Sequence, residues 1–283
     1  MSAQTMNSTA RLQGSGLVVG YGEHKVLDGV DFSVLEGELT VILGPNACGK
    51  STLLKTLSRV IPFKGGQVHL DGQPLSKLKS RAIARILSML PQTPEAPSGV
   101  TVADVVARGR YPHQSLLRSW SAQDEAACIE AMEAANVLEL SERPIEALSG
   151  GQRQRVWIAM TLAQQTPLIL LDEPTTYLDI THQIEVLNLT KKLHRQGRTV
   201  AVVLHDLNLA FRYATHVVLM KRGQIIAQGN PKKIVTSELI REVFDLEAVI
   251  IDDPCTGTPL VIPTEQQNIS IAADAIAAAR EGN

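Results

Sequence analysis

One stretch decides the fold of this chain: Gly44-Pro45-Asn46-Ala47-Cys48-Gly49-Lys50-Ser51, with the spacing G-x-x-x-x-G-K-S. It follows an apolar, β-prone run at 40–43, and residues 52–57 after it read as the beginning of a helix. A strand, a tight turn and a helix in that order form a phosphate-binding loop, because backbone N–H groups there point at anionic oxygens. The alternative is a glycine-rich turn that matches by chance, which the flanking strand and helix signals disfavour.

Individual residues of this loop have distinct expected roles. Lys50 is expected to reach the β- and γ-phosphates as a point charge, and the Ser51 hydroxyl is expected to bind Mg²⁺. Tyr21, in a turn before the second expected strand, could stack on an adenine ring or simply pack on the sheet edge. The predicted nucleotide-binding residues are Tyr21, Gly44, Pro45, Asn46, Ala47, Cys48, Gly49, Lys50, Ser51, Thr52 and Gln92.

Composition limits the class of protein. The chain has 283 residues, 44% of them hydrophobic, and a net charge of −2, which fits a globular protein with one large or two modest domains. The balanced charge gives no global basic excess, so nucleic acid is not an expected partner. The three cysteines lack C-x-x-C spacing, which argues against a disulfide framework or a zinc site and suits a reducing compartment.

No membrane-spanning or targeting segment is evident. Residues 1–9 are polar, which is unlike a signal peptide. The apolar runs are only a few residues long, as at 168–171, whereas a span needs about 20 residues. If the protein acts at a membrane, another chain is expected to supply the membrane part.

The pattern along the chain is that of an α/β protein with a helical insertion. Residues 12–43 read as strands, and short strands alternate with helices from 168 to 220, which predicts a parallel sheet with right-handed crossovers. Residues 93–147 begin with a proline-rich loop and continue as helices. Within them, residues 101–104 and 121–124 resemble capping boxes, and Cys128, Ile129, Met132 and Ala135 recur at helical spacing on one face.

A second glycine motif follows this insertion. Leu148-Ser149-Gly150-Gly151-Gln152 opens an expected helix over 153–164, so Ser149 can cap the helix or bind an anion at its N-terminus. The two glycines allow a phosphate to approach the backbone closely. Such Ser-Gly-Gly loops are common, so this motif gains meaning only beside the others.

Two apolar strands end in polar residues suited to phosphate chemistry. The run 168–171 leads into Asp172 and Glu173, at the strand end where α/β proteins place ligands. Asp172 is expected to hold Mg²⁺ through water, and Glu173 is expected to polarise the water that attacks the γ-phosphate. His205 follows the strand 199–204 and could hydrogen-bond a γ-phosphate oxygen. Gln92 could contact Mg²⁺ or the attacking water and leave when the nucleotide leaves.

Together these motifs resemble the ATP-binding subunits of ABC transporters over residues 12–263. The resemblance rests on the order of the phosphate-binding loop, Gln92, the signature 148–152, Asp172-Glu173, the Leu178-Asp179 turn and His205. Longer stretches, 108–113, 152–160, 174–180 and 251–254, are similar to importers of iron(III)–siderophore complexes of the ferric enterobactin type. ATPases of vitamin B12 and haem importers are similar too, and remain alternatives.

The resemblance implies a P-loop, RecA-like parallel-sheet core with an antiparallel β subdomain and a helical insertion subdomain. The implied division is a nucleotide-binding core over 12–92 and 165–263, a helical signature subdomain over 93–164, and a tail over 264–283 that could be disordered.

The resemblance also implies a mechanism and partners. ATP with Mg²⁺ is expected to lie between two copies of the chain, since each copy carries one phosphate-binding loop and one signature. The implied catalytic residues are Lys50, Glu173 and His205, and the implied metal ligands are Ser51, Gln92 and Asp172. The residues expected to cover the partner's ATP are Ser149, Gly150, Gly151 and Gln152. Asp179 is expected in a turn at the dimer interface.

The implied location is the cytoplasmic face of the cell membrane, on permease subunits served by a periplasmic or surface substrate-binding protein. The proline-rich loop and residues 108–113 are candidates for permease contact.

Two other functions remain open at this point. A non-transport ATPase of the same fold would carry a long coiled-coil insertion or tandem cassettes, and neither is seen. A regulatory module without hydrolysis would not need both Glu173 and His205.

One departure from the family pattern is Ala47, where such loops usually have glycine. If that position needs a positive φ, the alanine Cβ costs about 1 kcal/mol.

Overall fold

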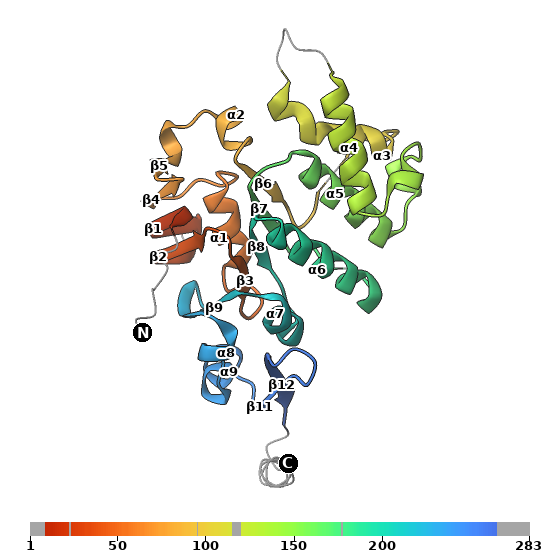
Figure 1. Cartoon of the computed structure of the whole chain (residues 1–283). Helices are drawn as coiled ribbons and strands as arrows, with labels where there is room; N and C mark the ends of the chain where they lie inside the picture. Colours follow the sequence, from red (N-terminus) through yellow and green to blue (C-terminus); the bar gives the residue numbers. More distant parts are fainter. Residues whose placement is uncertain (1–8, 23, 95, 115–119, 177, 265–283) are drawn as a thin grey trace, which may run out of the picture.

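The computed structural model describes residues 9–22, 24–94, 96–114, 120–176 and 178–264, and a six-stranded sheet lies at its centre (Figure 1). In spatial order its strands are β10 (Gln224–Gly229), β9 (His216–Lys221), β3 (Leu39–Leu43), β8 (Thr199–Val203), β7 (Leu168–Asp172) and β6 (Leu87–Leu90). The strands from β9 to β6 pair in parallel, and β10 pairs antiparallel with β9 at the edge. The predicted α/β class is therefore confirmed.

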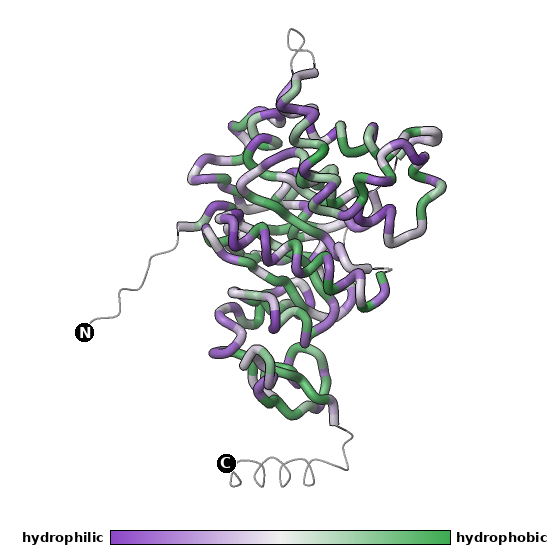
Figure 2. The backbone as a smooth tube through the Cα atoms, turned by 45° about the vertical axis from the view of Figure 1, so that its right-hand side comes forward, coloured by the Kyte–Doolittle hydropathy of each residue, from purple (hydrophilic) through white to green (hydrophobic). Residues whose placement is uncertain are grey.

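The middle strands of this sheet are buried on both faces. Every residue of β3, β7 and β8 is buried, which explains why these segments are almost continuously apolar instead of alternating. Successive residues belong to different cores: Val41 packs with the helical side and Ile42 with the β subdomain. In the view of Figure 2 the apolar segments likewise gather in the strands at the centre.

A separate antiparallel sheet forms the predicted β subdomain. In spatial order it contains β2 (His24–Leu35), β1 (Ala10–Tyr21), β4 (Gly65–Leu70) and β5 (Gln73–Pro74). Helix α1 (Lys50–Leu57) buries Leu53, Leu54 and Leu57 in the same core as Leu12 and Leu17 of this sheet. The helix that begins at the phosphate-binding loop is therefore held between the two sheets.

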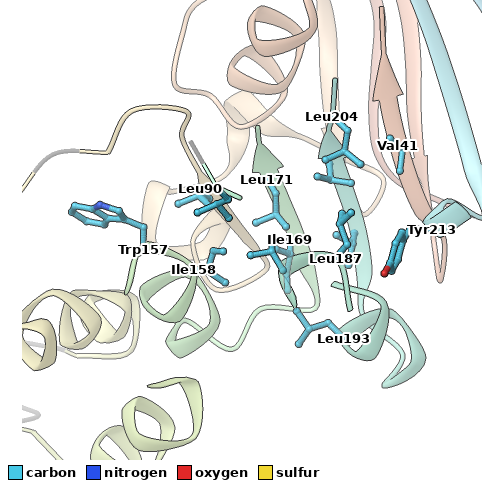
Figure 3. Packing of buried hydrophobic residues seen from close by; sticks show 14 of the residues in the cluster. Val41, Leu90, Trp157, Ile158, Ile169, Leu171, Leu187, Leu193, Leu204 and Tyr213 are labelled. Atoms are coloured by element: carbon cyan, nitrogen blue, oxygen red, sulfur yellow. The ribbon is translucent and has the colours of Figure 1, made fainter. Parts of the chain in front are cut away.

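Helices α6 (Ile180–Arg195) and α7 (Leu207–Tyr213) cover the opposite face of the central sheet. Figure 3 shows Leu187 and Leu193 of α6 and Tyr213 of α7 directed at the side chains of β7 and β3, among them Ile169 and Val41. This packing fixes the ends of β7 and β8, where the candidate catalytic residues lie.

The predicted helical insertion contains three longer helices, α3 (Val102–Ala107), α4 (Ala122–Ala134) and α5 (Gly150–Ala163). Both predicted capping boxes are confirmed, at Thr101 with Asp104 and at Ser121 with Asp124. The predicted apolar face of α4 is wrong at one position: Ile129 is 39% exposed, because the buried stripe runs through Ala127 and Cys128 instead.

Short elements complete the described part of the chain. They are α2 (Ser80–Ile83), α8 (Pro231–Ile234), α9 (Ser237–Phe244), the 3₁₀ turns η1 (Leu75–Lys77), η2 (Arg108–His113), η3 (Leu138–Leu140) and η4 (Ile145–Ala147), and the strands β11 (Ala248–Asp252) and β12 (Pro259–Pro263). Among the described helices, none combines the length and the apolar character that crossing a bilayer requires. Apart from Thr264, the predicted C-terminal tail lies outside the described residues.

Candidate functional site

The phosphate-binding loop connects β3 to α1 with a positive φ at three of its residues, Gly44, Ala47 and Gly49. Gly49, the N-cap of α1, has φ +107°, and a Cβ there would lie 2.9 Å from Leu27 Cδ2, so glycine is required. Ala47 has φ +60°. The positive φ on which the expected cost of the alanine Cβ depends is therefore present at this position.

Lys50 is buried beneath this loop and not extended into solvent. Its ammonium donates hydrogen bonds to the carbonyl oxygens of Gly44, at 2.8 Å, and Pro45, at 3.0 Å. These contacts hold the lysine charge at the floor of a cavity of about 280 Å³. The residues that line this cavity are His24, Val26, Asn46, Ala47, Cys48, Gly49, Lys50, Ser51, Thr52, Glu173 and His205.

Ser51 and Asp172 form the side of the site that suits a divalent cation. Ser51 Oγ donates to Asp172 Oδ1 at 2.8 Å. The other carboxylate oxygen, Oδ2, is buried without a hydrogen-bond partner among the described residues, and Lys55 Nζ is 3.9 Å away. Burial raises the pKa of Asp172, against the influence of Ser51 and Lys55. A hydroxyl beside an unsatisfied buried carboxylate fits Mg²⁺, which prefers oxygen ligands.

Glu173 lies at the same strand end, held by His205 and Gln92 from other segments and by Thr176 from its own turn. His205 Nε2 is 2.8 Å from its Oε1, Gln92 Nε2 donates to its Oε2 at 2.6 Å, and Thr176 Oγ1 donates to its Oε2 at 3.3 Å. Burial alone would raise the pKa of Glu173, but the hydrogen bond and charge of His205, with Gln92 and Thr176, lower it. The carboxylate is thus ionised at neutral pH and fixed in place.

The backbone at Glu173 is strained, with φ +53° in a non-glycine residue. Left-handed backbone at such a residue persists only where its surroundings hold it, and it concentrates at functional sites. The three contacts to its carboxylate, together with buried Asp172 before it, provide that constraint.

The signature motif forms an exposed helix N-terminus on the helical insertion. Ser149 Oγ accepts the Gln152 N–H at 3.2 Å, and Gln152 Oε1 accepts the Ser149 N–H at 3.1 Å. A Cβ on Gly150 would meet open space, so its backbone is accessible from outside. None of these residues is among the described residues that line the cavity over Lys50. The signature therefore does not contribute to the cavity of its own chain's phosphate-binding loop.

Asp179 caps α6 next to this region. Its carboxylate accepts the His182 N–H at 2.9 Å and lies 2.8 Å from His182 Nδ1, and the backbone contact is the first cause of its lowered pKa. The side chain is 65% exposed, and its place in a dimer interface stays a prediction.

Several predicted residues lie together, and others do not. The loop residues 46–52 share one cavity with Glu173 and His205, and Gln92 reaches that cavity through Glu173. Gln92 is bonded to this carboxylate and not to Ser51 or Asp172, so its metal role stays a prediction. Tyr21 is 59% exposed at the end of β1 and does not line the cavity, so adenine stacking also stays a prediction.

Sequence reasoning missed three residues of the site. His24 and Val26 line the cavity, and Thr176 binds Glu173. The position of His24 could have been inferred from pairing, because it lies opposite Tyr21 across the β1–β2 hairpin. Thr176 lies in the stretch 174–180 that is similar to siderophore importers, but its residue type and spacing give it no separate role.

Comparisons with known proteins agree on one family. The model of the family described as "ABC transporter" matches residues 27–176. The ferric enterobactin transport ATP-binding protein FepC of Escherichia coli (strain K12) is 51% identical over 257 residues, which cover 90% of this chain and 95% of that protein.

Solved structures extend the agreement to the fold. A structure described as an inward-facing, metal-chelate type ABC transporter has a TM-score of 0.77 and 27% identity, over 92% of this chain and 99% of the other. The dimeric structure of a bacterial ABC transporter cassette, MJ0796, has a TM-score of 0.69 and 27% identity, over 77% of this chain and 97% of the other.

Proposed function

Because the chain belongs to the ABC transporter family of ATP-binding subunits, we propose that it hydrolyses ATP to energise import of iron(III)–siderophore complexes. The observation that supports hydrolysis is Glu173, an ionised carboxylate that lines the same cavity as Lys50 and is fixed by His205 and Gln92. The importer assignment is supported by the 51% identity to a ferric enterobactin transport subunit.

The residues of the cavity divide the chemistry between them. The loop N–H groups and Lys50 bind the phosphates of ATP, and Glu173 orients water toward the γ-phosphorus. The water oxygen forms a bond to phosphorus as the bond to the β-phosphate oxygen breaks, and Glu173 accepts the proton of the water. His205 is 2.8 Å from Glu173 and lines the same cavity, and we propose that it also hydrogen-bonds a γ-phosphate oxygen.

Mg²⁺ is the cofactor that fits Ser51 and Asp172. Bound there, it would neutralise charge on the β- and γ-phosphate oxygens. The unsatisfied Oδ2 of Asp172 supports this assignment, because a buried carboxylate oxygen without a partner is costly unless a cation or water meets it.

A second copy of the chain completes each site. The phosphate-binding loop and the signature lie on different parts of one chain, and Ser149 and Gly150 are exposed. In an antiparallel pair, the signature of one copy covers the γ-phosphate held by the other. The similar cassette that was solved as a dimer supports this arrangement.

The remaining partners are membrane proteins. The chain is a peripheral subunit, which we place on permease subunits at the cytoplasmic face of the cell membrane, served by a periplasmic or surface substrate-binding protein. Gln92 and the insertion after it would carry the nucleotide state to the permease. The proline-rich loop and residues 108–113, including Tyr111 at 63% exposed, are the proposed contacts.

We propose that the chain is divided into a nucleotide-binding core and a signature subdomain. Residues 12–92 and 165–263 form the nucleotide-binding core with its β subdomain, and residues 93–164 form the signature subdomain. The buried pair of Arg110 and Asp124, 2.9 Å apart, supports this division because it joins two segments of the insertion to each other.

Purification with the permease tests the proposal. The complex, reconstituted with its binding protein in vesicles, is expected to release phosphate from ATP and to accumulate an iron(III)–siderophore complex. Haem or vitamin B12 accumulation in its place would overturn the substrate. Absence of phosphate release would overturn the enzyme assignment, and no permease in the purified material would favour a non-transport ATPase.

A further inference from the structure

Helix α7 begins directly after His205 and is bound along one side by the C-terminal hairpin, which is β11, β12 and the turn between them. Asp206 is its N-cap and accepts the Leu209 N–H at 2.8 Å. The helix has only seven residues and, at 1.5 Å per residue, is about 10 Å long. A displacement of its far end can therefore be transmitted to His205.

Two side chains of α7, one turn apart, bind the hairpin. Asn208 Oδ1 accepts the Val261 N–H at 2.7 Å, and Asn208 Nδ2 donates to the Val261 carbonyl oxygen at 3.2 Å. Arg212 donates from Nε and Nη2 to Asp253 Oδ2 at 2.9 and 2.7 Å. The hairpin is therefore clamped to one face of the helix (Figure 1).

Asp253 is built to hold this contact. It is 4% exposed, and its other oxygen accepts the Cys255 N–H at 2.8 Å. Its own N–H donates to the Thr258 carbonyl oxygen at 2.8 Å, and its carbonyl oxygen accepts the Gly257 N–H at 2.7 Å. The turn of the hairpin is thus organised around the carboxylate that binds Arg212.

The end of α7 next to His205 is less buried than its middle: residues 207–209 are half-buried, whereas Ala210 and Phe211 are buried in the core. A cavity of about 280 Å³ lies between the starts of α6 and α7, and its lining includes Leu209, Leu187 and His205. The cavity supplies no packing contacts on this side, so hydrogen bonds contribute more to the position of this end of the helix. The side-chain hydrogen bond between α7 and α6 in the described part of the chain lies at the C-terminal end of α7, where Tyr213 Oη donates to Asn188 Oδ1 at 2.9 Å.

We propose that the C-terminal hairpin is a positioning element for hydrolysis: through Asn208 and Arg212 it fixes α7, and so holds His205 against Glu173. The hairpin forms a two-stranded sheet of its own, separate from the central sheet, and such a hairpin is marginally stable alone. Displacement of a catalytic group by about 1 Å can cost on the order of a hundredfold in rate.

The test compares Arg212→Ala and Asn208→Ala with Arg241→Ala in the full chain bound to its permease. Arg241 pairs with Glu247 at 2.6 Å in the same C-terminal segment and, within the described part of the chain, forms no hydrogen bond or ion pair with α7, so it is a matched control. The α7 variants are expected to lose about tenfold in kcat with KM for ATP changed less than about twofold, because the phosphate-binding loop is untouched. Arg212→Lys, which keeps one charged contact to Asp253, is expected to recover part of the loss.

Ring proton signals of the histidines distinguish positioning from general destabilisation. In the α7 variants the His205 signals are expected to shift while those of His182, on α6, stay in place. Three results would each overturn the proposal. They are an unchanged kcat in the α7 variants, a loss of kcat equal to that of Arg241→Ala, and a loss of kcat that matches the fraction of unfolded protein. If either alanine variant fails to fold, Arg212→Lys and Asn208→Ser are compared by the same criteria.

This inference rests on the proposed ATPase activity, and the two can fail separately. A wild-type complex that releases no phosphate would remove the proposed function. Wild-type hydrolysis with normal rates in the α7 variants would remove only the role of the hairpin.

Discussion

His205 Nε2 lies 2.8 Å from Glu173 Oε1, and this contact joins the ends of the two strands β8 and β7 above the phosphate-binding loop. The contact is the main influence that lowers the pKa of Glu173 against the effect of burial. A carboxylate with a lowered pKa stays ionised as the pH falls through the ordinary range for glutamate. In the proposed mechanism, the pair therefore extends the pH range over which Glu173 can orient water.

The pH dependence of hydrolysis is predicted to change in His205→Ala. Without the hydrogen bond and charge of His205, burial becomes the larger influence and the pKa of Glu173 rises. The acid limb of the rate profile is then expected to move to higher pH, measured by single-turnover phosphate release. His182→Ala, which removes a histidine from a different carboxylate, Asp179, is the control. An acid limb at the same pH in His205→Ala would contradict the role of this contact.

Glu173→Gln is predicted to retain ATP binding and lose hydrolysis by at least about a hundredfold, since the amide cannot accept the proton of the water. Two copies with ATP in both sites should then persist, and gel filtration should show an ATP-dependent dimer. Glu185→Gln is the control, because Glu185 is an exposed carboxylate that pairs with Arg155 on the surface. Hydrolysis at the wild-type rate in Glu173→Gln would show that another group orients the water.

Ala47→Gly is predicted to tighten ATP binding. The φ of +60° costs an alanine about 1 kcal/mol, and relief of that strain corresponds to roughly fivefold in the dissociation constant if the loop adopts this backbone only when ordered around phosphate. Titration calorimetry measures the effect. Asn136→Gly, at φ +53° away from the site, should leave ATP affinity unchanged. Equal or weaker affinity in Ala47→Gly would mean that the strain is the same with and without nucleotide.

Sequence reasoning placed most of the core because local and long-range signals agree there. The apolar runs before Gly44, Asp172 and His205 predict inner strands of a parallel sheet, and parallel strands bring their ends to one edge. Contacts between distant segments were harder to infer. The bond from Gln92 to Glu173 and the binding of α7 by Asp253 depend on side-chain geometry that no spacing encodes.

The shared site makes a prediction about mixed dimers. Lys50→Ala should inactivate every site in its own dimer, and so should Ser149→Arg, whose side chain would block the exposed signature. A mixed dimer, however, contains one intact site, formed by the loop of the Ser149→Arg copy and the signature of the Lys50→Ala copy.

An equal mixture of the two variants is therefore expected to recover about a quarter of wild-type phosphate release, because half of the dimers are mixed and each has one of two sites intact. Each variant alone, at the same total concentration, is the control. No recovery on mixing would mean either that both sites must be intact together or that each chain forms its own site. Covalently linked dimers separate these explanations: a linked pair with both changes in one copy leaves no complete shared site, yet keeps one complete site if each chain acts alone. Hydrolysis by that linked pair would refute the shared site.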